Sequence, residues 1–284
     1  MSRKIVIPGV TFTGPALRDD PIINAGSLLL VDVNHPVAPW ASIPAAGALI
    51  PNIARAQAST LIGSTADADV CPVITTGRTP PAITLTSKGS LRMASTGPVN
   101  GWHIKYPPAI IGYIKANPAH RLGLCLWCGL DGPSTAVVSG IWTYLTTDSR
   151  STTDNTKSSY SRFSPTSSSM NSAGSSGTQS PSGNTTVSPR EIVASSGTSD
   201  DNGATAVTAQ KCSRIIGTGN VPASPTMAGI PNGAGASLVF HRFYLEDLTA
   251  SGRTLAALTA ADQALYQAAF AAGGRYSATE YTGV

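Results

Sequence analysis

Charged residues are scarce in this sequence. Asp, Glu, Lys and Arg make up only 12% of its 284 residues, about half the share found in an average soluble protein. The 19 basic and 15 acidic residues leave a net charge of +4, and the basic residues form no run and are not interleaved with aromatic ones. This distribution argues against nucleic-acid binding. Because cytosolic helical enzymes carry many charged residues on surface helices, the low charge favours a turn-rich β protein that is buried in an assembly.

Long apolar runs and a cysteine framework are missing as well. No stretch approaches the roughly 18 apolar residues of a membrane span. The apolar residues 5–7 are too few for the core of a signal peptide, and Pro8 interrupts them. The four cysteines are too few for the disulfide scaffold of a secreted domain. We therefore expect a protein that is made in the cytoplasm and does not insert into a membrane.

The spacing of the cysteines does not predict a metal or redox site. Cys125 and Cys128 form a CxxC, but Cys71 and Cys212 are isolated, and a zinc site needs a second pair at compatible spacing. The flanking residues alternate as in a β-strand, which places the two CxxC thiols on opposite faces, whereas a thioredoxin-like pair lies at a helix N-terminus. We interpret the cysteines as buried structural residues and expect no metal and no cofactor.

No catalytic motif is recognisable. The four histidines are scattered and no GxSxG motif occurs, so serine chemistry would need a triad assembled from distant segments. Glycoside hydrolysis needs two carboxyl groups a few ångströms apart. Glu246 and Asp247 follow a predicted strand, but we expect them to cap the strand end or to pair with Arg253. We assign no catalytic, cofactor-binding or metal-ligating residue and predict a protein that is not an enzyme.

Proline dominates the N-terminal part of the chain. Seven prolines between positions 8 and 51 exclude a long helix there, while the apolar stretch SLLLVDV at 27–33 predicts a strand. We expect residues 1–55 to form an extended N-terminal arm that carries one or two strands and lies along a neighbouring subunit. Trp40, Ile50 and Ile53 are the candidate interface residues of this arm.

Residues 56–284 are expected to form one mainly β domain. Alternating apolar residues predict a hairpin over 83–93, with a turn at Ser87-Lys88-Gly89, and further strands over 102–106 and 122–130. Such a chain of short strands is typical of a β-sandwich or a jelly-roll-like fold.

The end of the domain carries the clearest pattern. Residues 238–246 are apolar on both faces of a predicted strand, so we expect this strand to lie buried in the centre of a sheet. The only helix that we predict is a short C-terminal one over about 260–272, with Thr259 as its N-cap and with Gly273 and Gly274 ending it.

A Ser/Thr-rich tract interrupts the predicted domain. Of the 60 residues from 149 to 208, 28 are Ser or Thr. The first part, about 149–183, has few large apolar residues, so we predict an inserted surface loop or hairpin that neighbouring subunits order. Residues 184–217 regain β-branched residues at alternating positions and are expected to return to the sheet. Tyr160 and Phe163 are candidate interface anchors, since aromatic residues concentrate binding energy.

The C-terminal sequence FHRFYLEDLTASGRT, followed by LTAADQALYQAAFAAGG, resembles the ending of structural proteins of tailed bacteriophages that carry a lectin-like, concanavalin-type β-sandwich. The stretches SLLLVDVNHP and IPAAGALIPNIA resemble the opening of such proteins. The resemblance covers about the first 55 and the last 50 residues. It implies a virion component that is assembled in the host cytoplasm, and it transfers no active-site residue.

Three hypotheses about function follow. The leading one is a non-enzymatic virion protein of the tail or the capsid surface, which forms a homo-oligomer (a trimer is one option) and docks on other virion proteins. The alternative is a receptor-binding tail module that holds a host surface glycan through exposed aromatic residues. The weakest is a polysaccharide-degrading tail enzyme, which would need two buried carboxyl groups in a cleft.

Overall fold

The structure is a computed structural model that describes residues 20–76, 82–94, 102–117, 119–130, 162–164, 167–171, 190–195, 215–218 and 238–277. Its strands are β1 (Ser27–Asp32), β2 (Val73–Thr76), β3 (Ala82–Leu85), β4 (Leu91–Ala94), β5 (Trp102–Lys105), β6 (Leu122–Leu130), β7 (Arg162–Ser164), β8 (Ser167–Asn171), β9 (Arg190–Ser195), β10 (Ile216–Thr218) and β11 (Leu238–Asp247). Its helices are α1 (Arg55–Ile62), α2 (Asp67–Val70), α3 (Pro108–Ala116), α4 (Leu248–Ser251) and α5 (Leu255–Phe270).

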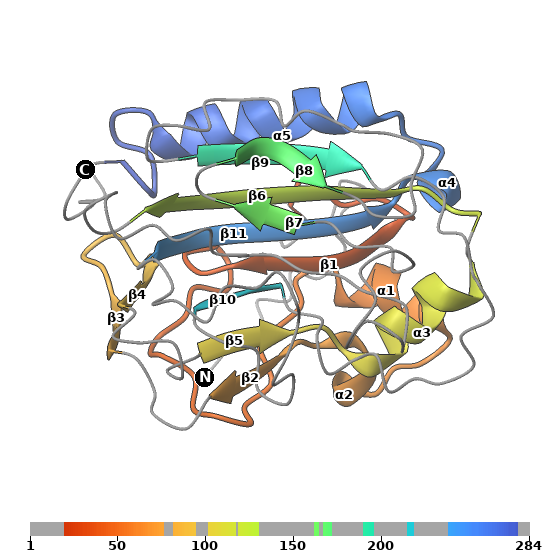
Figure 1. The fold of residues 1–284 in the computed structure, drawn as a ribbon, viewed down its shortest axis with the longest axis horizontal. Helices are drawn as coiled ribbons and strands as arrows, with labels where there is room; N and C mark the ends of the chain where they lie inside the picture. Colours follow the sequence, from red (N-terminus) through yellow and green to blue (C-terminus); the bar gives the residue numbers. More distant parts are fainter. Residues whose placement is uncertain are drawn as a thin grey trace, which may run out of the picture.

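Strand β11 forms the middle of the main sheet (Figure 1). Strand β6 pairs with one edge of β11 over its whole length. On the other edge, β4 pairs with residues 238–240 and β1 pairs with residues 242–246. Strand β3 extends the sheet beyond β4, β9 extends it beyond β6, and all of these pairings are antiparallel. The longest apolar strand is therefore shielded along both of its edges.

A smaller antiparallel sheet, in the order β10–β5–β2, lies next to the main sheet (Figure 1). Leu49 forms an isolated bridge to Val73 of this sheet. Ile74, Ile104 and Ile216 of the small sheet share one core with residues of β1, β6 and β11. The described part of the chain is thus largely strand-based, with a curled antiparallel sheet that resembles half of a barrel and with a helix at its C-terminal end.

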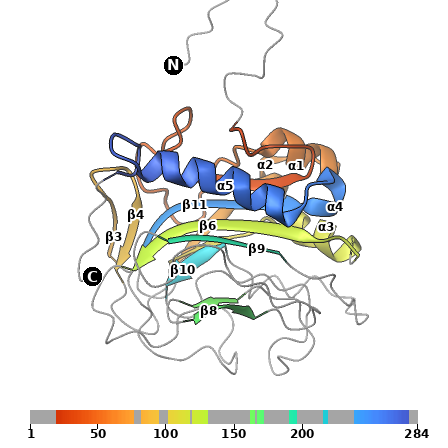
Figure 2. The same cartoon turned by 90° about the horizontal axis from the view of Figure 1, so that it is seen from above.

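Strand β11 is covered on both faces, and all of its residues are buried. Phe240 and Leu245 face the core that the two sheets share, whereas Tyr244 belongs to a second core that contains Leu258 of α5. Figure 2 shows α5 on one side of the main sheet and β10 on the other. The prediction that residues 238–246 form a strand buried on both faces is confirmed.

The structure differs from the expected N-terminal arm over residues 1–55. Residues 20–54 belong to the body of the subunit, since β1 pairs with β11 and all residues of β1 are buried. The side chain of Asn52 accepts a hydrogen bond from the backbone N–H of Leu30 at 2.9 Å, which ties the loop after β1 to the sheet. The prolines exclude a helix here, but they do not prevent a strand between them. Residues 1–19 lie outside the described residues.

Helices α1, α2 and α3 lie where only short strands were expected, so the prediction of a single helix is wrong. They span eight, four and nine residues, which is too short for a helical period to stand out in the sequence. Local signals are present nevertheless. Pro108 occupies the first turn of α3, and Gly63 ends α1 in the left-handed conformation with φ 75°.

The C-terminal helix begins earlier than expected. Helix α5 starts at Leu255, because Thr254 is the N-cap: its Oγ1 accepts a hydrogen bond from the N–H of Ala257 at 3.1 Å. Thr259, the predicted cap, lies inside the helix, where its hydroxyl donates to the carbonyl oxygen of Leu255. The helix itself and its end near Phe270 agree with the prediction.

Most other strand predictions are confirmed. The expected hairpin is β3–β4, and Gly89 in its turn has φ 71°. Strands β5 and β6 lie at the predicted positions, β9 falls within residues 184–217, and β10 begins within this range and ends at Thr218. Inside the Ser/Thr-rich insertion about 149–183, β7 and β8 form an antiparallel pair. The remainder of that insertion lies outside the described residues.

Candidate functional site

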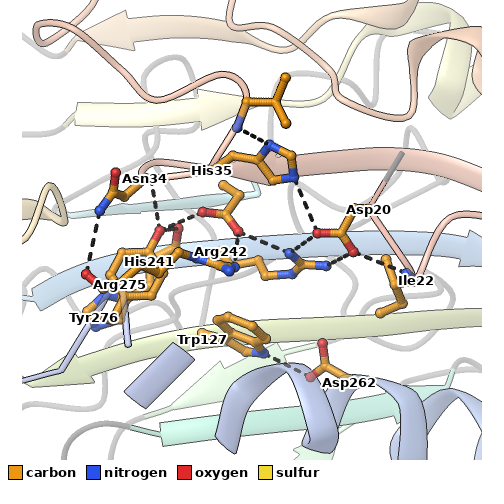
Figure 3. Close-up of polar contacts among 12 residues, drawn as sticks. Asp20, Ile22, Asn34, His35, Trp127, His241, Arg242, Asp262, Arg275 and Tyr276 are labelled. Carbon is orange, nitrogen blue, oxygen red and sulfur yellow. Dashed lines mark hydrogen bonds and ion pairs between the residues drawn. The ribbon is translucent and has the colours of Figure 1, made fainter. Parts of the chain in front are cut away.

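A cluster of buried charges surrounds Arg242 in the centre of β11 (Figure 3). We call Asp20, Asp32, Arg242, Arg275 and Tyr276 the Arg242 cluster. The guanidinium group donates to both carboxylate oxygens of Asp20, at 2.7 and 2.9 Å, and to Asp32 Oδ2 at 3.0 Å. The cluster therefore joins the segment before β1, the end of β1 and the middle of β11.

Asp32 is held from a second side by the C-terminal end of the described chain. Arg275 donates to Asp32 Oδ2 at 2.6 Å, and the hydroxyl of Tyr276 donates to Asp32 Oδ1 at 2.6 Å. The backbone N–H of Asn34 in turn donates to the hydroxyl of Tyr276 at 2.9 Å. A single carboxylate on β1 thus binds side chains from β11 and from the segment after α5.

The electrostatics of the cluster keep Asp20 and Arg242 ionised. Burial alone would raise the pKa of Asp20, but the hydrogen bonds from Arg242 and His35 hold it well below its usual 3.8. Burial alone would lower the pKa of Arg242, but Asp20 and Asp32 hold it above its usual value. Two arginines and two aspartates balance one another, so the cluster carries no net charge. This arrangement holds the segments before β1, in β11 and after α5 together, and each of these four charged side chains is paired within the cluster.

Trp127 extends the cluster to the helix layer. The guanidinium carbon of Arg242 lies 4.8 Å from the centre of the Trp127 ring, within the range of a cation–π contact. The indole N–H donates to Asp262 Oδ2 on α5 at 2.9 Å (Figure 3). The side chains of β11, β6 and α5 are thereby connected through one fully buried tryptophan.

Glu246 and Asp247, the carboxylates considered for catalysis, are engaged at the end of β11. Glu246 Oε2 forms an ion pair with Arg253 at 3.2 Å, and Asp247 Oδ1 accepts the N–H of Ala250 at 2.8 Å as the N-cap of α4. Asp247 Oδ2 lies 2.6 Å from His120 Nδ1. The expected pairing with Arg253 is confirmed for Glu246, whereas Asp247 caps helix α4, which the sequence analysis did not predict.

His241 on β11 is fully buried, and its pKa is shifted. Its Nδ1 is hydrogen-bonded to Ser90 Oγ at 2.8 Å, and both residues are fully buried. Burial lowers the pKa of His241 to about 3, so the imidazole stays neutral at physiological pH. A serine and a histidine therefore meet here, but they are shielded from any substrate in solution.

The cysteines lie as the strand pattern predicted. Cys125 and Cys128 form no disulfide bond; both are buried, and they lie on opposite faces of β6, since each belongs to a different core. Cys71 is free and buried, and Cys212 lies outside the described residues. In the part of the chain that the structure describes, no three His, Cys, Asp or Glu side chains are grouped closely enough to hold a metal ion. Among the described helices, none is long and apolar enough to span a membrane.

The candidate interface residues fall into different environments. Ile50 has no exposed surface and belongs to the core that the two sheets share. Trp40 and Ile53 are partly buried at the edges of two cores. Tyr160 and the side chain of Phe163 lie outside the described residues.

Two exposed apolar residues escaped the sequence analysis. Val37 is 44% exposed and Leu49 is 43% exposed, and both follow β1 in the same proline-rich stretch as Trp40. The signal that could have identified them is the concentration of apolar residues in a segment with many prolines, where few backbone positions can pair in a sheet.

A hollow of about 630 Å³ opens beside α1. It is lined by Ile53, Arg55, Ala56, Ser59, Thr60 and Thr65. The guanidinium group of Arg55 is already bound to Asp67 at 2.7 Å and to the carbonyl oxygen of Thr65 at 2.8 Å. The hollow therefore offers mostly hydroxyl and aliphatic groups.

The aromatic side chains proposed for sugar stacking are mostly internal. Trp102 is 1% exposed and Trp127 is fully buried, while Trp142 lies outside the described residues.

Comparisons with protein-family models, with curated proteins and with solved structures found no match to this chain.

Proposed function

We propose that this protein is a non-enzymatic structural component of a bacteriophage virion, which acts by forming a homo-oligomer and by docking on other virion proteins. The observation that carries the proposal is the internal pairing of its buried charges. Asp20 and Asp32 are balanced by Arg242 and Arg275, Glu246 binds Arg253, and Asp247 caps a helix. Among the described residues, these charges bind one another and tie segments of the chain together, as expected of a structural protein. The resemblance of the C-terminal sequence to phage structural proteins supports a role in the virion.

A surface for self-association is available in the proline-rich stretch after β1. Val37 and Leu49 are exposed, and Trp40 is partly exposed beside them in the chain. Apolar side chains that remain exposed in a protein with few surface charges favour contact with other subunits. We assign this stretch to the homo-oligomer interface, with a trimer as one option for the assembly.

At the level of the fold, we propose that the curled main sheet and the small β10–β5–β2 sheet are the two layers of a lectin-like β-sandwich. The support is the core that they share, with Ile74, Ile104 and Ile216 on one side and Phe240 and Leu245 on the other. A sandwich buries one face of each sheet in this way.

The alternative function, glycan binding at a host surface, is favoured by one observation. Trp40 is partly exposed, whereas Trp102 and Trp127 are buried. A glycan array with the purified protein discriminates between the two functions. Specific binding that Trp40→Ala abolishes would favour the receptor-binding module.

The assembly proposal is tested by native mass spectrometry and sedimentation velocity on the purified protein. We expect a discrete homo-oligomer for the wild type and a shift toward monomer for Val37→Asp and for Leu49→Asp, because each places a charge in an apolar contact. The matched control is Gln263→Glu, which adds the same charge at an exposed position of α5. A wild type that stays monomeric at all concentrations would contradict the proposal.

A further inference from the structure

Two carboxyl groups meet beneath helix α5. Glu191 lies on β9, directly opposite Trp127 of β6 in the register of the sheet. Asp262 lies on α5 and accepts the hydrogen bond of the same tryptophan at Oδ2 (Figure 3). Glu191 is 6% exposed and Asp262 is fully buried. The two carboxyl groups are within hydrogen-bonding reach of each other, at the contact between the helix and the strand.

Each of these carboxyl groups has one oxygen that lacks a donor. Among the residues that the structure describes, neither Glu191 Oε1 nor Asp262 Oδ1 receives a hydrogen bond. If both groups were ionised, two negative charges would face each other away from water, which is strongly unfavourable. One proton held between the two groups removes the repulsion and supplies the missing donor.

The surrounding charges assign the proton mainly to Glu191. Burial raises the pKa of Asp262, but the charge of Arg242 and the indole N–H of Trp127 oppose this shift. Burial, together with the charge of Asp262, raises the pKa of Glu191 to about 8. The other titratable or charged groups near the pair are Asp20, Cys125, Cys128, Tyr266 and, on the ring of Trp127, Arg275.

We propose that a proton shared by Glu191 and Asp262 fastens helix α5 to strand β9, and that the loss of this proton at mildly alkaline pH loosens the helix from the sheet. A metal ion fits less well than a proton between the carboxyl groups of Glu191 and Asp262. Asp262 Oδ2 is already bound to Trp127, and the guanidinium group of Arg242, on the other side of Trp127, repels a cation.

The direction of the pH effect follows from the proton count. With α5 docked, Glu191 keeps its proton up to a pKa of about 8, whereas the exposed carboxyl loses it near 4.5. The docked state therefore holds one proton more between these values, and docking weakens about tenfold for each pH unit until it levels off above pH 8.

Other buried groups act in the opposite direction at lower pH. The pKa of His241 is lowered by burial from 6.5 to about 3, so its contribution to stability is lost as the pH falls through this range. Asp20, whose pKa is held below 3.8, loses its contribution at still more acid pH. The range from pH 6.5 to 8 therefore isolates the carboxyl pair.

Hydrogen exchange of the α5 amides, corrected for the intrinsic exchange rate, tests the proposal between pH 6.5 and 8.5. We expect wild-type protection to fall about fivefold from pH 7 to pH 8, since the fall flattens as the pH reaches the pKa of Glu191. In Glu191→Gln the amide mimics the protonated acid and still donates to Asp262, so protection should change by less than about twofold. The matched control is Asp67→Asn, which removes an exposed carboxylate and should keep the wild-type profile.

A second variant, Asp262→Asn, tests the proposal independently in case Glu191→Gln does not fold. Asp262→Asn removes the charge that faces Glu191 and supplies a donor to it, so it should reduce the change between pH 6.5 and 8, although burial still raises the pKa of Glu191. Wild-type protection that stays constant over this range would overturn the proposal. So would Glu191→Gln and Asp262→Asn proteins that both keep the wild-type profile. Restoration of protection at pH 8.5 by Ca²⁺ or Mg²⁺ would also overturn it, since the pair would then be a cation site.

Discussion

Arg242 lies in the middle of the longest strand, among residues that are otherwise mostly apolar. Its guanidinium group is buried with Asp20 and Asp32, and the ring of Trp127 covers it. Moving such ions out of water costs several kcal/mol each, so the intact cluster adds little net stability, but the loss of one partner leaves an unpaired charge in the interior. The cluster therefore determines which segments pack together, but it adds little to the free energy of that packing.

This reasoning predicts a large effect of Arg242→Met. The free energy of unfolding should fall by about 3–5 kcal/mol, because the buried carboxylate of Asp20 loses its arginine and Asp32 keeps only Arg275. Urea denaturation at pH 7 measures the difference. The control is Arg55→Met, since the ion pair of Arg55 with Asp67 is half-exposed, at 50% and 60%, and should contribute less than about 1 kcal/mol. Equal losses in the two variants would show that Arg242 does not bear a structural ion cluster.

The sequence could not predict this cluster, although it predicted the ion pair of the neighbouring Glu246 with Arg253. Arg242 meets Asp32 across 210 positions and Asp20 across 222 positions, so no local spacing brings them together. Asp247, in contrast, caps a helix that begins at the next residue, and the Arg253 partner of Glu246 is close in the chain. Short-range polar contacts leave a pattern in the sequence, and contacts that the sheet creates do not.

Among the elements, helix α5 covers the face of the main sheet that carries Arg242 and Trp127 (Figure 2). Its position depends on a start at Leu255, which lets Leu258 and Ala269 reach buried positions. The start is defined by the side chain of Thr254, and a sequence pattern alone also allowed Thr259.

The two threonines give opposite predictions. Thr254→Ala should lower the free energy of unfolding by about 1 kcal/mol, because the N–H of Ala257 loses its cap. Thr259→Ala should be neutral or slightly stabilising, since alanine is the better residue inside a helix. Thermal denaturation followed by circular dichroism compares them. A larger loss for Thr259→Ala would place the helix start at the later position.

Close packing of α5 on β6 depends on Gly123. A Cβ at this position would collide with the side chains of Leu258 and Leu248. Gly123→Ala should therefore destabilise the protein by about 1–3 kcal/mol through overpacking. The matched control is Gly112 in α3, where a Cβ meets nothing within 4 Å, so that Gly112→Ala should stabilise by about 0.5–1 kcal/mol. Urea denaturation curves that rank the two variants in the reverse order would contradict this packing.

Strands were predicted more accurately than helices, for a physical reason. In β11 and β6, apolar side chains face a buried layer on each side, and this leaves long runs that stand out in the sequence. Helices α1 and α3 have two turns or little more, and their apolar residues contact the core only at a few positions. The tertiary contacts, not a clear period, decide that these segments are helical.

At the scale of the whole molecule, both ends of the described chain are tied to its middle. Asp20, near the beginning, binds Arg242, and Arg275, near the end, binds Asp32. Opening the subunit therefore requires buried ion pairs to separate. A subunit braced in this way keeps its shape while its surface makes contacts, which suits a component of a large particle.

The proposed virion role is tested most directly by quantitative mass spectrometry of density-purified phage particles from cells that produce the protein. We predict that peptides of this chain are found in the particles, in a fixed ratio to the other structural proteins, and that a high-salt wash does not remove them. Recovery of the chain only in the soluble fraction of the lysate, with none in the particles, would contradict the proposed role.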